Sequence, residues 1–196
     1  MNKFMATILL IMVFSFLSAC GTNNNEKIIV ESDIEVVYFD KNQLVNHADA
    51  IIEGQVISQE VQKDFRGFPV TDTLIRVTKI LKGNPDKEVE IRVEGGETDD
   101  MIYEPEENLL PTFEIGEIVT VFLTSNKGNR PDKDDFGYYV VGQAQGKFVE
   151  SNGMLKNQDH EFITNNFEAE LLTIEQSNRI NNLEKFYLEE GEESDI

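Results

Sequence analysis

Cysteine and basic residues are scarce in this chain of 196 residues, and each shortage excludes a class of function. The single cysteine rules out an intramolecular disulfide framework and a zinc site built from several thiolates. Lysine and arginine number 17 against 37 aspartates and glutamates, which gives a formal net charge of −20. Such a charge repels nucleic acid and anionic membrane surfaces, so we expect neither as an electrostatic partner.

Sequence motifs of known catalytic chemistry are missing as well. The chain has no Gly-x-Ser-x-Gly elbow, P-loop, His-Glu-x-x-His motif or dinucleotide fingerprint. Its two histidines, His47 and His160, lie far apart in polar stretches, where a surface or capping role is favoured over catalysis. We therefore predict a protein that is not an enzyme and that needs no cofactor or structural metal.

The first nineteen residues have the layout of a secretory signal peptide. Lys3 is their only charge, and an almost unbroken apolar run extends from Phe4 to Leu17. This run is shorter than the ~20 residues that a helix needs to cross a bilayer, so a retained transmembrane helix is disfavoured. Small residues precede Cys20, as at a cleavage position.

Leu17-Ser18-Ala19-Cys20 resembles the lipobox of bacterial lipoproteins. The resemblance implies cleavage before Cys20 and lipidation of its thiol, with the protein on the extracytoplasmic face of the bacterial cell membrane. Two or more acyl chains give stable attachment. Lipid must supply the attachment, because the chain without Lys3 has a net charge of −21 and is repelled by anionic membrane surfaces. The alternative is a secreted protein whose cysteine is incidental.

Alternating apolar residues predict a mainly β fold between the tether and the last thirty residues or so. Val89, Ile91 and Val93 alternate with Glu88, Glu90, Arg92 and Glu94, which predicts a strand with one wet face. Residues 117–124 are apolar on both faces and predict a central strand. The other expected strands are 34–39, 51–61 with a bulge at Gly54, 73–81, 138–141 and 147–149, the last followed by a turn at Asn152-Gly153.

Two helices are expected beside these strands. Asp40 is placed to cap a short helix that ends near His47. Asn165 and Glu168 resemble a capping box, after which Phe167, Leu171 and Ile174 share one face of a helix that polar residues 176–182 should break or kink. We therefore expect a signal peptide (1–19), a lipidated tether (20–32), an antiparallel β-barrel domain (33–160), a C-terminal helical segment (161–188) and an acidic tail (189–196).

Three segments together resemble small secreted bacterial domains of unknown function and, more distantly, the netrin module shared with tissue inhibitors of metalloproteinases. They are 48–56 (Ala-Asp-Ala-Ile-Ile-Glu-Gly-Gln-Val), 77–83 ending in Leu-Lys-Gly, and 113–117 leading into 121–123. The resemblance covers about residues 48–150 and implies a small OB-like five-stranded barrel. Netrin modules contain disulfides that this chain cannot form, and the inhibitors bind zinc through a free N-terminal cysteine, whereas Cys20 would be acylated. The barrel is therefore expected and the inhibitory activity is not.

An acidic stretch between Arg92 and Lys127 is the most distinctive charge feature. It contains nine acidic and no basic residues, opens with Gly95-Gly96 as an expected hinge, and is stiffened by Pro105 and Pro111. A solvated loop, a Ca²⁺ site and a docking surface for a protein or small ligand all fit this composition. The candidate partner-binding residues are Glu97, Asp99, Asp100, Glu104, Glu106 and Glu107.

A second acidic segment, Asp132–Gly137, matches the start of a calcium-binding loop. The match fails because Phe136 occupies the fifth position and Gln143 the twelfth, where oxygen ligands are required. We therefore predict a loop that connects two strands. Aromatic residues near the expected loops fit either a ligand-contact rim or the core: Phe65, Phe68, Tyr103, Phe113 and Phe136.

Three functions remain compatible with the sequence. The first is a membrane-anchored, non-catalytic binding or interaction module, and the second is a divalent-cation-dependent hydrolase that uses loop carboxylates. The third is a structural component of the cell envelope. If Glu97, Asp99, Asp100 and residues 132–135 met at one point, the cation-dependent function would be favoured.

Overall fold

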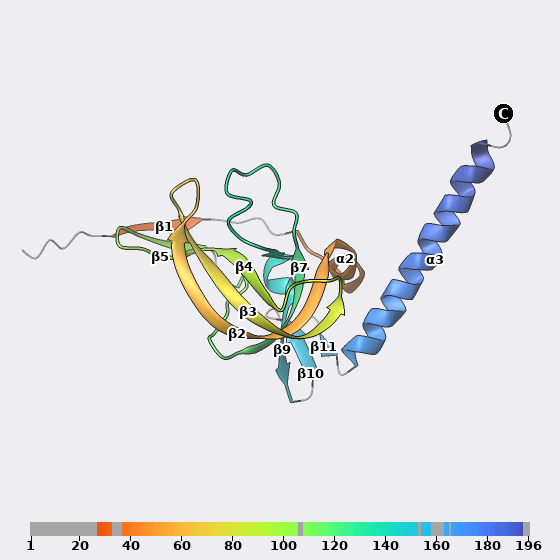
Figure 1. Cartoon of the computed structure of the whole chain (residues 1–196), viewed down its shortest axis with the longest axis horizontal. Helices are drawn as coiled ribbons and strands as arrows, with labels where there is room; N and C mark the ends of the chain where they lie inside the picture. Colours follow the sequence, from red (N-terminus) through yellow and green to blue (C-terminus); the bar gives the residue numbers. More distant parts are fainter. Residues whose placement is uncertain are drawn as a thin grey trace, which may run out of the picture.

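A computed structural model describes residues 27–32, 37–105, 108–152, 154–157, 163–164 and 166–193 of the chain. Within these residues the fold is mainly β, with a 3-stranded and an 8-stranded sheet followed by a long C-terminal helix (Figure 1). The predicted mainly β class and C-terminal helix are thus confirmed. Residues 1–26, which include Cys20 and the expected signal peptide, lie outside the described part.

The helices and strands follow one another in a fixed order. They are β1 (Ile28–Ser32), α2 (Lys41–His47), β2 (Ala50–Lys63), β3 (Pro69–Lys82), β4 (Glu88–Glu94), β5 (Gly96–Glu97), β6 (Met101–Pro105), β7 (Ile118–Thr124), β8 (Tyr139–Val140), the 3-10 helix η1 (Gln143–Gly146), β9 (Lys147–Ser151), β10 (Met154–Asn157), β11 (Ile163–Thr164) and α3 (Phe167–Glu193).

The larger sheet has the order β11-β10-β9-β7-β2-β3-β4, and β8 pairs with β7. Strands β2 and β3 are 14 residues long and curve strongly across the body (Figure 1). The register shifts between Glu53 and Gly54, which confirms the predicted bulge. A Cβ at Gly54 would lie 2.5 Å from Cγ2 of Ile75, so only glycine permits this approach of β2 to β3.

Strand β7 lies between β2 and β9, which confirms the predicted central strand. Val119, Val121 and Leu123 enter one apolar cluster inside the curved strands, whereas Phe122 enters a second cluster beneath α2 and α3. Side chains of neighbouring residues in a strand point to opposite faces, so Phe122 lies on the face opposite to Val119, Val121 and Leu123. Segment 117–124 therefore carries apolar residues on both faces because both faces of β7 are covered.

Backbone pairing between β4 and the β8 region is limited, in the described residues, to one isolated bridge. Tyr138 donates from its backbone N–H to Glu90 O at 2.9 Å, and Arg92 N donates to Tyr138 O at 3.0 Å. This parallel bridge is not a ladder, so no closed barrel is found among the described strands.

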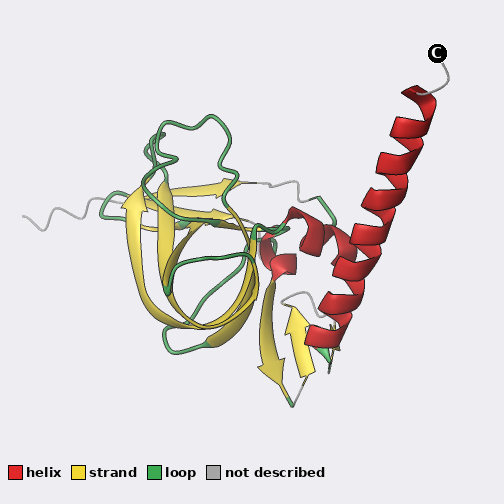
Figure 2. Cartoon of the chain, turned by 45° about the vertical axis from the view of Figure 1, so that its right-hand side comes forward, coloured by secondary structure: helices red, strands yellow, loops and turns green. Residues whose placement is uncertain are grey.

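Helices α2 and α3 pack on the outer face of the larger sheet. Asp40 and Gln43 form a reciprocal capping box at the start of α2, which confirms that predicted helix start. Leu171 and Ile174 of α3 pack with Leu44 and Phe122 in the second apolar cluster. Figures 1 and 2 show the first turns of α3 beside this body and its C-terminal end extending away from it.

Two local expectations came out differently, and a third was confirmed. Helix α3 runs without interruption through 176–182, so the predicted break is wrong. Side chains there are accommodated locally, since Ser177 Oγ donates to Thr173 O at 2.9 Å. Residues 37–39 are not in a strand, and the rest of the expected first strand, 34–36, lies outside the described residues. Strands β9 and β10 pair in antiparallel fashion on either side of Asn152, whose φ is 55°, as the predicted turn requires.

Candidate functional site

A cleft of about 870 Å³ lies between the small sheet and the β2–β3–β4 part of the large sheet. Its lining joins segments that are far apart in the sequence. The lining residues are Glu31 of β1, Gln59 of β2, Thr71 and Thr73 of β3, Val93 and Glu94 of β4, Gly95 and Gly96, Tyr103, Glu104 and Pro105 of β6, and Asn108 and 110–113 of the following segment. This volume is within the range of ordinary ligand-binding pockets.

The floor of the cleft consists of buried side chains. Thr73, Tyr103, Leu110 and Phe113 are all at most 8% exposed. Thr73 Oγ1 accepts a hydrogen bond from Gln59 Nε2 at 3.3 Å. Burial of Tyr103 and Phe113 fits the core interpretation of these aromatics, and both also line the cleft.

The rim of the cleft is acidic. Glu31 and Glu104 are exposed and stand at facing positions of the parallel β1–β6 pair. Glu94 also lines the cleft and accepts a hydrogen bond from Arg66 Nη2 at 3.0 Å. No lysine or arginine is among the described residues that line the cleft. The site therefore combines an apolar floor with negative charge at its mouth.

Two contacts hold the walls of the cleft in place. Lys147 of β9 is buried, and its ammonium group binds Glu117 at 2.8 Å and the carbonyl of Thr112. On the opposite wall, Thr71 Oγ1 donates to Gly95 O at 2.8 Å. The predicted Gly95-Gly96 hinge is closely packed, because a Cβ on Gly95 would lie 2.9 Å from Cδ of Pro105.

The predicted partner-binding acids do not share one site. Glu104 lines the cleft, whereas Glu97 pairs with Lys27 and Asp100 with Lys63, each at 2.6 Å on the surface. Hydrogen bonds from Lys63 and Thr98 lower the pKa of Asp100. Asp99 is exposed and is not part of the cleft lining. Glu106 and Glu107 lie outside the described residues.

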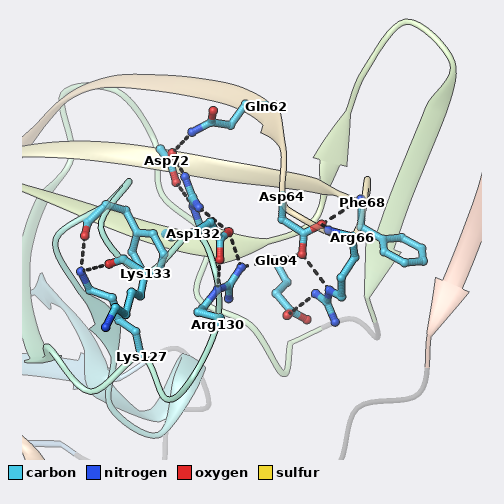
Figure 3. A network of polar contacts seen from close by, with 12 residues as sticks. Gln62, Asp64, Arg66, Phe68, Asp72, Glu94, Lys127, Arg130, Asp132 and Lys133 are labelled. Atoms are coloured by element: carbon cyan, nitrogen blue, oxygen red, sulfur yellow. Dashed lines mark hydrogen bonds and ion pairs between the residues drawn. The ribbon is translucent and has the colours of Figure 1, made fainter.

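A buried ion-pair network lies next to the cleft (Figure 3). Arg92 is 2% exposed, and its Nε and Nη2 donate to the two oxygens of Asp72 at 2.6 Å each. Its Nη1 donates to Asp132 at 3.0 Å, and its guanidinium stacks over Phe136 at 4.2 Å. The predicted wet face of β4 is therefore wrong at Arg92, because carboxylates from two other segments surround it.

The network continues to the β2–β3 turn. Asp64 accepts hydrogen bonds from the backbone N–H groups of Arg66 at 2.9 Å and Phe68 at 3.0 Å, and from Arg66 Nε at 2.8 Å. Arg130 binds Asp132 through Nη2 at 2.7 Å and lies 3.7 Å from Asp64. Three arginines thus face three aspartates, and Glu94 also pairs with Arg66. This mutual pairing assigns the network to the architecture that positions β3, β4 and the β7–β8 loop.

Hydrogen bonds set the charge state of two of these aspartates. Burial acts to raise the pKa of Asp64, but hydrogen bonds from Arg66 and the Phe68 backbone outweigh it and hold this pKa below the ordinary value. The Arg130 hydrogen bond likewise lowers the pKa of Asp132. Both carboxylates are therefore ionised at neutral pH and stay paired.

The structure gives no geometric support to cation binding. Residues 125–138 connect β7 and β8, as predicted for the segment around Asp132. Within the described part of the chain, no three histidine, aspartate or glutamate side chains come together as metal ligands. His47 is exposed and lies 2.8 Å from the Gln43 carbonyl, while His160 lies outside the described residues.

Comparison with known proteins adds no relative to this picture. No protein-family model matches the chain, and no curated protein shows significant similarity to it. In the described residues, none of the helices combines the length and the apolar character that crossing a bilayer requires.

Sequence reasoning missed most of the cleft. Thr71 and Thr73 lie in an apolar strand, two residues apart on one face, and this spacing of polar β-branched residues was the available signal. Glu31 lies in the segment expected to be tether, whereas β1 pairs with β6 over five residues.

Proposed function

We propose that this protein is a lipid-tethered, non-catalytic binding module on the extracytoplasmic face of a bacterial cell membrane. The cleft carries the proposal, because it offers a buried apolar floor and charged groups at its mouth. The lipobox-like sequence before Cys20 supports the anchor. Residues 21–27 would then span at most about 25 Å between the lipid and β1. The ligand would thus be held close to the membrane.

We further propose an OB-like arrangement of the five strands that form the inner core. Antiparallel ladders join β7 to β2, β2 to β3, and β3 to β4. Strand β8 pairs with β7, and the bridge between Ile91 and Tyr138 links its approach to β4. These contacts support a ring of five strands in which β4 and β8 are linked by a single bridge, as in a partly open OB-like barrel.

The anchor is tested by replacing the lipid acceptor. Cys20→Ser should abolish the lipid-modified N-terminus that mass spectrometry detects in the wild-type protein, and should prevent detergent-dependent recovery of the mature chain. A wild-type protein with an unmodified thiol, found entirely in the medium, would contradict the proposal.

Binding in the cleft is tested by site-specific photo-cross-linking in cells. A photoreactive amino acid replaces Thr112, which is exposed and lines the cleft, or Asp86, which is exposed on the β3–β4 turn outside it. We expect an adduct that forms only from position 112 and disappears when Thr73→Trp fills the cleft. Equal adducts from both positions, or none from either, would favour a structural role in the envelope.

A further inference from the structure

Strand β1 forms the outer edge of the small sheet, whose order is β1-β6-β5. Ile28 N donates to Asp100 O at 2.9 Å, so its backbone is directed toward the paired segment. Peptide groups of alternate residues in a strand point to opposite edges, and those of Ile29 and Glu31 therefore point outward. In the described residues no strand pairs with β1 on that side. Unpaired backbone groups of this kind can template another strand.

The side chains on this edge define what could pair with it. Ile28 and Ile29 are 60% and 63% exposed, unusually high for isoleucines in a strand. Glu31 faces Glu104 across the β1–β6 pair, and neither carboxylate has an ion-pair partner among the described residues. The edge therefore combines exposed β-branched side chains with two adjacent negative charges.

A second copy of the chain is a poor partner for this edge. Edge-to-edge pairing of two β1 strands would bring the acidic side chains of both copies close together, because each strand spans only five residues. Such pairing gives neither acid a basic partner, and each chain carries −20 overall. A basic strand has the complementary charge.

We propose that the open edge of β1 receives an extended, basic segment of another protein by strand addition. An apolar residue of that segment lies opposite Ile29, and a lysine or arginine two positions away lies opposite Glu31. The inference rests on the proposed binding function, whose cleft shares Glu31 with this edge. It adds the partner class and the mode of docking.

The test uses purified full-length protein in detergent solution and a short peptide of alternating lysine and valine. A peptide of the same sequence with every backbone nitrogen methylated keeps the charge but cannot donate to a strand. Spermine supplies a flexible polycation without a backbone. Binding is measured by isothermal titration calorimetry, and pairing by the amide hydrogen exchange of β1.

Five variants separate charge from backbone pairing. Glu31→Gln should weaken peptide binding about threefold to fivefold, and Glu104→Gln less, because it lies one strand further away. The double variant Glu31→Gln/Glu104→Gln is matched by Glu60→Gln/Glu150→Gln, which changes net charge equally outside the cleft. Ile29→Pro removes an outward donor and should abolish binding while β6 keeps its hydrogen bonds.

We expect that only the unmethylated peptide binds and that it slows amide exchange at Ile29 and Glu31. Binding should be weakened in the Glu31 variants, abolished by Ile29→Pro and unchanged in the control pair. Equal binding of the methylated peptide or spermine, or equal loss in both double variants, would reduce recognition to bulk charge and overturn the proposal. A position-112 adduct in cells would still support the cleft in that case. If that adduct is absent but strand addition is observed in vitro, the cleft is contradicted as the binding site and the strand-addition proposal stands.

Discussion

Arg92 and Asp72 form a two-point ion pair in the interior of the molecule, with both donor–acceptor distances at 2.6 Å. The residues are 2% and 6% exposed and stand at facing positions of β3 and β4. Asp72 also accepts a hydrogen bond from Gln62 of β2. The pair therefore ties together the three strands that form one wall of the cleft.

Replacing Arg92 with methionine should lower the free energy of unfolding by about 3–5 kcal/mol, because Asp72 would remain buried without its charge partner and Asp132 would keep only Arg130. Urea denaturation measures the change. Arg76→Met is the matched control, since Arg76 pairs with Glu88 at the surface and should cost at most about 1 kcal/mol. Similar losses in both variants would show that the buried pair contributes no more than a surface one.

This ion pair also marks where sequence-based prediction succeeds and where it ends. Period-two alternation predicted strand β4, and apolar residues on both faces predicted the central position of β7. Alternation assigned Arg92 to the wet face because its partners Asp72 and Asp132 lie 20 and 40 residues away. Of the predicted site acids that the structure describes, only Glu104 lines the cleft, since the cleft depends on long-range pairing of β1 with β6.

Acid should destabilise the protein through Asp64 and Asp132, whose pKa values are lowered in the folded state. Below the unfolded-state pKa of about 3.9, the unfolded chain binds more protons than the folded one. The free energy of unfolding therefore decreases as the pH is lowered. The contribution is complete above that value and disappears as the pH drops through the folded-state pKa. Urea titrations from pH 6 to pH 2 should show this decline.

Asp64→Asn/Asp132→Asn provides the comparison for that acid titration. The double variant should be less stable than the wild type at pH 6, because both Asp–Arg pairs are lost. The difference between the two proteins should shrink as the pH approaches 2. A constant difference would assign the acid sensitivity to other carboxylates.

Glycine at position 83 is required for two reasons, and its replacement by alanine should be strongly destabilising. Its φ is +78°, and a Cβ would lie 2.2 Å from the carbonyl oxygen of Asp49. Gly67 is the matched control, because its φ is +87° but no atom lies within 4 Å of the added carbon. Gly67→Ala should cost about 1–2 kcal/mol from the left-handed conformation alone, and Gly83→Ala about 1–3 kcal/mol more from the clash. Thermal unfolding of both variants would measure the two contributions, and equal losses would mean that the β3–β4 turn moves away from Asp49 without cost.

Glu90 should respond in the opposite direction from the aspartates. Burial, together with the charge of Asp72, raises the pKa of Glu90, so its ionised form opposes folding. Its contribution to stability is favourable below the unfolded-state pKa of about 4.3 and is lost as the pH rises through the folded-state value. Glu90→Gln should therefore stabilise the protein at pH 7, by about 0.5 kcal/mol or less.

Glu88→Gln should instead be slightly destabilising, because Glu88 accepts hydrogen bonds from Arg76 on the surface. Urea midpoints at pH 7 and pH 4 distinguish the two variants: the advantage of Glu90→Gln should disappear at pH 4, and an advantage that persists there would have to come from packing rather than charge.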